Sequence, residues 1–134
     1  MLGLAKASNF EEGQVWSYKT RQGEENSTIL INKIEHNKVL GKIFHISINE
    51  IKLKNPHIEG GISTELPHSP VSEKTLKISV LKLIGSSPPN PNHQEGYNTW
   101  KAAFDEGDAG IFTISVSELV EYIEQAINQQ PTQP

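Results

Sequence analysis

The sequence predicts an α+β fold, in which a twisted antiparallel sheet of three to five strands carries two to three helices. Three observations lead to this prediction. Segments rich in β-branched residues, separated by Gly and Asn turns, fill the first part of the chain. In the second part, apolar residues at helical spacing follow polar cap residues. Finally, 134 residues with 35% hydrophobic content are enough for one buried core. An SH3-like curl is one form that we consider for this sheet.

The whole chain, 1–134, is expected to form a single domain, because no linker or internal repeat divides it. Residues 1–12 are expected to be a loose lead-in, with Phe10 anchoring it to the domain. Residues 129–134 are rich in Gln and Pro and are expected to be a frayed tail.

The first strand begins after Gly13 and shows a period of two. Trp16 and Tyr18 lie on one face and Ser17 and Lys19 on the other, so one face is aromatic and the other polar. A turn follows, because the next residues are Gln-Gly-Glu-Glu-Asn and both Gly and Asn tolerate turn conformations.

The rest of the sheet is predicted from β-branched runs and breaks. A second strand is expected over 29–34 and a third over 42–48. Asn and Glu at 49–50 indicate a tight turn before a short fourth strand at 51–54. Residues 55–70 contain three prolines and two adjacent glycines, which predicts a long loop of functional interest.

The first helix is predicted to start at Ser72, a good N-cap residue, and to end before Gly85. Its apolar face is expected to contain Leu76, Val80, Leu83 and Ile84.

Two more helices follow a proline-rich loop. Tyr97, Trp100 and Phe104 have the spacing of one helix face, and Gly107 closes that helix. After a brief strand at 111–114, a capping box from Ser115 to Glu118 starts the last helix. Its buried stripe is expected to contain Leu119, Ile123, Ala126 and Ile127.

Composition excludes some classes of function. The net charge of -4 disfavours a nucleic-acid or anionic-membrane partner, since such binders need clustered Lys and Arg. With no cysteine and no apolar run long enough for a membrane span or signal peptide, we expect a cytoplasmic protein. No motif indicates a metal site or a cofactor.

Two groups of polar residues are candidates for a binding site. The polar side of the opening hairpin contains an Arg whose donor fork suits carboxylates or phosphates, while the long loop contains two histidines that suit proton transfer. The candidate binding residues are Lys19, Arg21, Glu24, Glu25, His57 and His68. No catalytic residue is assigned. Elsewhere, His45 is expected to form hydrogen bonds on the second face of the sheet, and His93 is placed in a turn without a role.

Two resemblances accompany these residues. Gly13-Gln14-Val15-Trp16 with Tyr18-Lys19-Thr20-Arg21, together with Pro67-His68-Ser69-Pro70, resembles a family of small, functionally uncharacterised bacterial proteins, and this resemblance implies no activity. The hairpin alone resembles the opening of PemK/MazF-type endoribonuclease toxins. Those toxins have an Arg-Pro pair after the Glu of the turn, whereas this chain has Glu25-Asn26-Ser27.

The favoured hypothesis is a non-enzymatic protein-binding domain, of which an immunity or antitoxin-type protein that neutralises a bacterial toxin is one form. Its partner would be another protein. The alternative is a small hydrolase or nuclease that uses Arg21, Glu24 and one loop histidine. Convergence of these side chains in one pocket would favour the enzyme.

Overall fold

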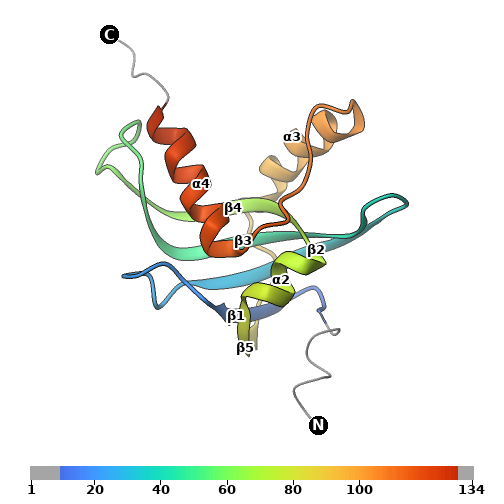
Figure 1. Ribbon diagram of the computed structural model, residues 1–134, viewed down its shortest axis with the longest axis horizontal. Coiled ribbons are helices and arrows are strands. Elements are labelled where there is room, and N and C mark those ends of the chain that lie inside the picture. Colours follow the sequence, from blue (N-terminus) through green and yellow to red (C-terminus); the bar gives the residue numbers. More distant parts are fainter. Residues whose placement is uncertain (1–9, 130–134) are drawn as a thin grey trace.

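Five strands form one antiparallel sheet in the order β4-β3-β2-β1-β5, which Figure 1 shows from edge to edge. This computed structural model describes residues 10–129. The strands are β1 (Gln14–Tyr18), β2 (Thr28–Asn37), β3 (Gly41–Lys54), β4 (Ile62–Ser72) and β5 (Val80–Ser86). The helices are α2 (Glu73–Ser79), α3 (His93–Asp105) and α4 (Val116–Gln129). The predicted α+β fold is therefore confirmed.

Side-chain alternation along β3 separates two environments. Phe44 and Ile46 are fully buried in a core that includes Leu76 of α2 and Leu119 of α4. Successive residues of a strand point to opposite faces, so His45 between them points to the other face. There it meets the aromatic side chains of α3. The sheet thus carries α2 and α4 against its apolar face and α3 against a polar, aromatic one.

The predicted opening hairpin is confirmed. Trp16 and Tyr18 are 2% and 3% exposed, so the aromatic face of β1 belongs to the core. Phe10 is also buried and packs edge-on against Trp16 and Phe44, as expected for the anchor of the lead-in. Otherwise, most of the predicted lead-in and tail, at 1–9 and 130–134, lies outside the described residues.

Two predictions about the middle of the chain are wrong. Residues 49–54 are not a turn and a new strand, because β3 runs through them with an irregular register, and Glu50 takes a positive φ of 59° there. Residues 55–70 are not one long loop either, since β4 begins at Ile62. Its prolines, Pro67 and Pro70, are tolerated because β4 is an edge strand whose outward side needs no ladder hydrogen bonds.

The predicted helix from Ser72 is correct at its start and wrong at its end. The Ser72 side chain accepts a hydrogen bond from the Thr75 amide, as an N-cap does, but α2 stops at Ser79. Val80, Leu83 and Ile84 lie in β5 instead of on a helix face. Pairing with β1 supplies the backbone hydrogen bonds that a longer helix would have supplied.

The later elements largely follow the sequence. The capping box is present, because the Glu118 amide donates to Ser115 Oγ (3.2 Å) while the Ser115 amide donates to Glu118 Oε1 (3.1 Å). Leu119 is buried in α4, whereas Ala126 is exposed. The brief strand at 111–114 is reduced to one parallel bridge from Phe112 to β4.

Candidate functional site

Arg21 lies at the centre of an ionic network between the opening hairpin and α4. Its Nε and Nη2 donate to the two carboxylate oxygens of Glu24 at 2.9 and 2.7 Å. Its Nη1 donates to Glu124 at 2.8 Å and to Glu121 at 3.0 Å. The Lys52 amide also donates to Glu24, at 2.7 Å. The donor fork of this arginine is therefore occupied by carboxylates of the same chain.

The electrostatics agree with a structural role for this pair. Burial raises the pKa of the Glu24 carboxyl, but the hydrogen bonds from Arg21 and from the Lys52 amide outweigh it and leave the pKa below its usual value. The Glu24 hydrogen bonds raise the pKa of the Arg21 guanidinium. Both groups are charged at neutral pH, and each neutralises the other in a place with little water.

The remaining predicted binding residues do not gather around this network as one site. Lys19 is exposed, and Glu25 accepts a hydrogen bond from the Gly23 amide in the turn. His57 donates to the carbonyl of Ile127 in the last turn of α4 (3.1 Å). His68 belongs to a different cluster, described next. The structure thus joins Arg21 with Glu24 and gives His68 other neighbours.

A cluster of histidine and aromatic rings lies between the sheet and α3. The rings of His45 of β3 and His68 of β4 lie nearly parallel, 16° apart, with ring centroids 5.1 Å apart. His93, at the start of α3, lies 5.6 Å from His68. Tyr97 and Trp100 meet His45 edge-on at 4.8 and 4.9 Å. These rings attach α3 to the sheet.

His45 and His68 continue a chain of hydrogen bonds that starts at a carboxylate. Glu35 Oε1 lies 2.9 Å from His45 Nε2, and His45 Nδ1 lies 2.9 Å from His68 Nε2. Because an ionised carboxylate only accepts, His45 Nε2 must hold the proton. A neutral His45 then accepts at Nδ1, so His68 Nε2 must be the donor. This order of donors fixes the tautomer of both rings.

In this series of hydrogen bonds, the negative charge lies on Glu35. Lys101 of α3 donates to its Oε2 (3.0 Å), and the Tyr97 hydroxyl donates to its Oε1 (3.2 Å). Burial raises the pKa of Glu35, but Lys101 and His45 outweigh it and lower the pKa below the usual value. Burial lowers the pKa of His68 to about 3, assisted by the neighbouring His45 and His93, so this ring is neutral at physiological pH.

This cluster was only partly visible in the sequence. The expected hydrogen bonding of His45 on the second face is confirmed, whereas the placement of His93 in a turn is wrong because it begins α3. His93 lies four residues before Tyr97 and seven before Trp100, which places all three on one helix face. This spacing was the signal in the sequence that could have revealed the cluster.

Gly96 allows α3 to approach His68 closely. A Cβ at this position would lie 2.9 Å from His68 Cβ, which is close to the backbone and cannot swing away. We expect Gly96→Ala to lower the free energy of unfolding by about 1 kcal/mol, because the strain of overpacking exceeds the gain in helix propensity. Chemical denaturation measures this. Gly110→Ala, where a Cβ would meet nothing within 4 Å, is the control and should be neutral; equal effects of both substitutions would contradict the close approach.

The two edges of the sheet differ in how they are protected. At the β4 edge, Phe112 exchanges backbone hydrogen bonds with Pro70 and Ser72. At the other edge, β5 pairs only with β1 among residues 10–129. Six of its seven residues are exposed, and Leu81, Leu83 and Ile84 are each about half exposed (49%, 47% and 50%).

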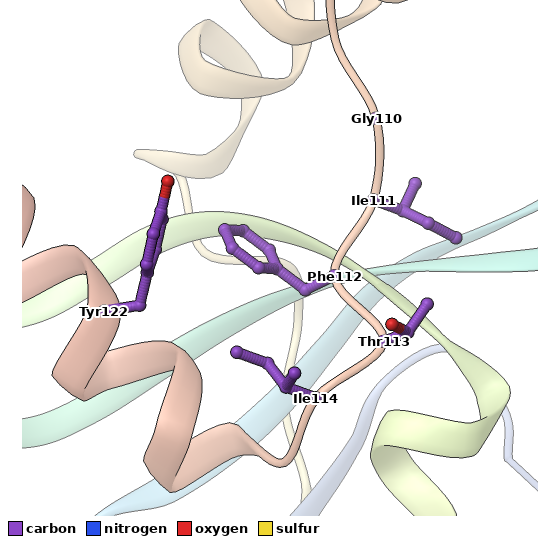
Figure 2. Close-up of a pocket in the computed structure, with 6 residues that line it drawn as sticks. All are labelled: Gly110, Ile111, Phe112, Thr113, Ile114 and Tyr122. Atoms are coloured by element: carbon purple, nitrogen blue, oxygen red, sulfur yellow. The ribbon is translucent and has the colours of Figure 1, made fainter.

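A third surface feature is an apolar hollow of about 400 Å³ beside α4. Figure 2 shows the Tyr122 ring facing the Phe112 ring, with Ile114 below them. The two rings meet edge-on at 6.0 Å, and Tyr122 is 58% exposed. This hollow offers side chains to a partner, but the backbone pairing of its lining residues within 10–129 is limited to the bridge that already joins Phe112 to β4.

Comparisons with protein-family models, curated proteins and solved structures find no match to this chain. The resemblances of the opening hairpin therefore stay predictions, and function is argued from geometry. Among residues 10–129, no helix is long and apolar enough to cross a membrane, and no three His, Cys, Asp or Glu side chains are placed to hold a metal ion.

Proposed function

We propose that the protein is a non-enzymatic binding domain that adds an extended segment of another protein to the edge of β5 that faces away from β1. The observation that carries this proposal is the exposed apolar character of an edge strand. Natural sheets usually protect such edges with charges, prolines or a covering segment, because unpaired backbone groups bind other strands. Here the β4 edge has two prolines and a bridge, while β5 has neither within the described residues.

The charges beside β5 indicate the chemistry of the partner. Lys74, Lys77 and Lys82 are exposed, and no Asp or Glu occurs between residues 74 and 94 in a chain whose net charge is negative. Opposite charges at an interface favour encounter and register. An extended segment that alternates apolar and acidic side chains would place its apolar groups on Leu81 and Leu83 and its carboxylates near these lysines.

The favoured surface thus moves from the opening hairpin to β5. Arg21 and Glu24 are engaged with each other and with α4, and His68 has its own partners, so the geometry does not support their action as one hydrolase or nuclease site. The hollow at Tyr122 is a weaker candidate because strand addition also uses the backbone of β5. A toxin is one partner that fits this proposal, but only the hypothesis drawn from the sequence supports it.

Site-specific crosslinking in cells tests the proposal. A photoreactive phenylalanine analogue in place of Leu83 is expected to give a discrete heterologous adduct, and Lys82→Glu in the same chain should reduce its yield. The same analogue in place of Val39, which is 88% exposed in the β2–β3 turn, is the matched control. It should give no such adduct.

Mass spectrometry of the adduct decides between the outcomes. Attachment within an extended, acidic segment of another protein supports the proposal. An adduct of twice the mass of the chain would show a second copy at the edge and contradict a heterologous partner. Equal adducts from positions 83 and 39, or none from 83, would also overturn it.

A further inference from the structure

A hollow of about 530 Å³ opens where α3 crosses β4, away from the contacts that carry the proposed strand addition. It is lined by Pro67 and His68 of β4, by Asn92 just before α3, and by Glu95, Gly96, Thr99 and Trp100 of α3. No Lys or Arg is among these lining residues. The lining contains one carboxylate, that of Glu95, and one imidazole, that of His68.

The key acceptor is a nitrogen whose state the neighbouring hydrogen bonds determine. His68 Nε2 must donate to His45 Nδ1, because the other nitrogen of His45 donates to the Glu35 carboxylate. The second nitrogen of His68, Nδ1, is then left without a proton. Within the described part of the chain it makes no hydrogen bond, and it lies beside Gly96. The chain of hydrogen bonds from Glu35 therefore presents a lone pair at this hollow.

We propose that this hollow binds a small organic cation with N–H donors, an ammonium or guanidinium group, through His68 Nδ1 and the Glu95 carboxylate. The donors of the cation satisfy the lone pair and the carboxylate, and the Trp100 side chain lines the same hollow. The group belongs either to a free amine or to a Lys or Arg side chain of a peptide. This site is independent of the β5 edge.

Other small ligands suit the hollow less well. An anion would be attracted by the N-terminal amides of α3, but it would also meet the Glu95 carboxylate, and no Lys or Arg is among the lining residues. A transition metal ion would find one imidazole nitrogen and one carboxylate, fewer protein ligands than stable sites use. A cation without N–H donors could contact Trp100 but would leave His68 Nδ1 unpaired.

His68 Nδ1 stays unprotonated in mild acid, so binding at this site has a distinctive pH dependence. An ordinary histidine gains its second proton near pH 6.5 and then repels a cation. Burial, assisted by His45 and His93, holds the pKa of His68 near 3. Binding should therefore change little between about pH 7.5 and pH 5.5. A site that used an ordinary histidine would lose about tenfold in affinity over this range.

NMR titration of the full chain with methylammonium and with guanidinium tests the proposal. We expect saturable shifts of the His68 side-chain nitrogens and the Trp100 indole with either probe. Tetramethylammonium, which lacks N–H donors, and inorganic phosphate should not shift the His68 nitrogens. A short peptide with one lysine, compared with its acetylated form, tells whether the site also accepts a side chain.

Glu95→Gln is the informative variant, because this exposed residue can change without disturbing the fold. It should weaken methylammonium binding about three- to fivefold, the scale of an exposed ion pair. Glu106→Gln, at an exposed position just after α3, is the matched control and should have no effect. Equal binding of tetramethylammonium, tighter binding of phosphate or of Zn²⁺ alone, or an equal loss in both variants would overturn the proposal.

Discussion

Replacing Arg21 with alanine is expected to lower the free energy of unfolding by about 2 to 3 kcal/mol. The substitution leaves Glu24, which is 4% exposed, as a buried carboxylate whose remaining donor is the Lys52 amide. It also removes the contacts of the hairpin to Glu121 and Glu124 of α4. We expect a smaller loss of stability than for a fully buried ion pair, because the Arg21 side chain is 18% exposed.

Chemical denaturation of three variants separates charge from geometry. Arg21→Lys keeps the charge and loses the two-pronged contact with Glu24, so its loss should be smaller than that of alanine. Lys19→Ala changes an exposed lysine of the same hairpin and should be neutral within about 0.5 kcal/mol. If Arg21→Ala is as stable as Lys19→Ala, the network does not hold the hairpin to α4.

Mild acid is expected to destabilise the protein through the histidine cluster. Burial lowers the pKa values of His45, His68 and His93 in the folded state, that of His68 to about 3. In the unfolded chain these groups titrate near pH 6.5. Their neutral forms thus favour folding above this pH, and the advantage is lost as the pH falls below 6.5 toward the folded value. Each such group contributes up to about 1.4 kcal/mol per pH unit.

The other charged groups around the cluster define where to measure this slope. Glu35 and Lys33 face it from β2, and Tyr97 and Lys101 from α3. Because the Glu35 carboxyl titrates in more acid solution, the stability between about pH 7 and pH 5 reports the histidines. We expect stability, measured by urea denaturation, to fall through this range.

His68→Gln identifies the contribution of one ring. Its amide can still donate to His45 Nδ1, but it does not titrate. The slope of stability against pH should therefore be smaller in this variant by about the share of one histidine. A wild-type protein whose stability is flat between pH 7 and pH 5, or a variant with an unchanged slope, would contradict the assignment.

The sequence predicted those parts of the fold that depend on local signals. The alternation in β1, the Ser72 cap and the capping box from Ser115 to Glu118 each have a sequence signal within a few residues, and all three are confirmed. The end of α2 has no such local signal. Val80 to Ile84 is apolar at four of five positions, which suits a helix or a strand, and pairing with β1 decided between them.

The candidate site was harder to predict because its parts are distant in the sequence. Glu35, His45, His68 and His93 come from three strands and a helix, and only the register of β2, β3 and β4 brings the first three together. Arg21 and Glu24 are close in the sequence and were predicted as neighbours, but the partners of Arg21 on α4 lie about one hundred positions away. Charge pattern alone could not show that the guanidinium was already occupied.

Amide hydrogen exchange of β5 tests strand addition most directly. The probe is a decapeptide that alternates valine and glutamate, and the control peptide has lysine in place of glutamate. With the acidic peptide we expect slower exchange at the alternate amides of β5 that face away from β1, and no change at the β2–β3 turn. Unchanged exchange throughout β5, or equal protection by both peptides, would contradict the account.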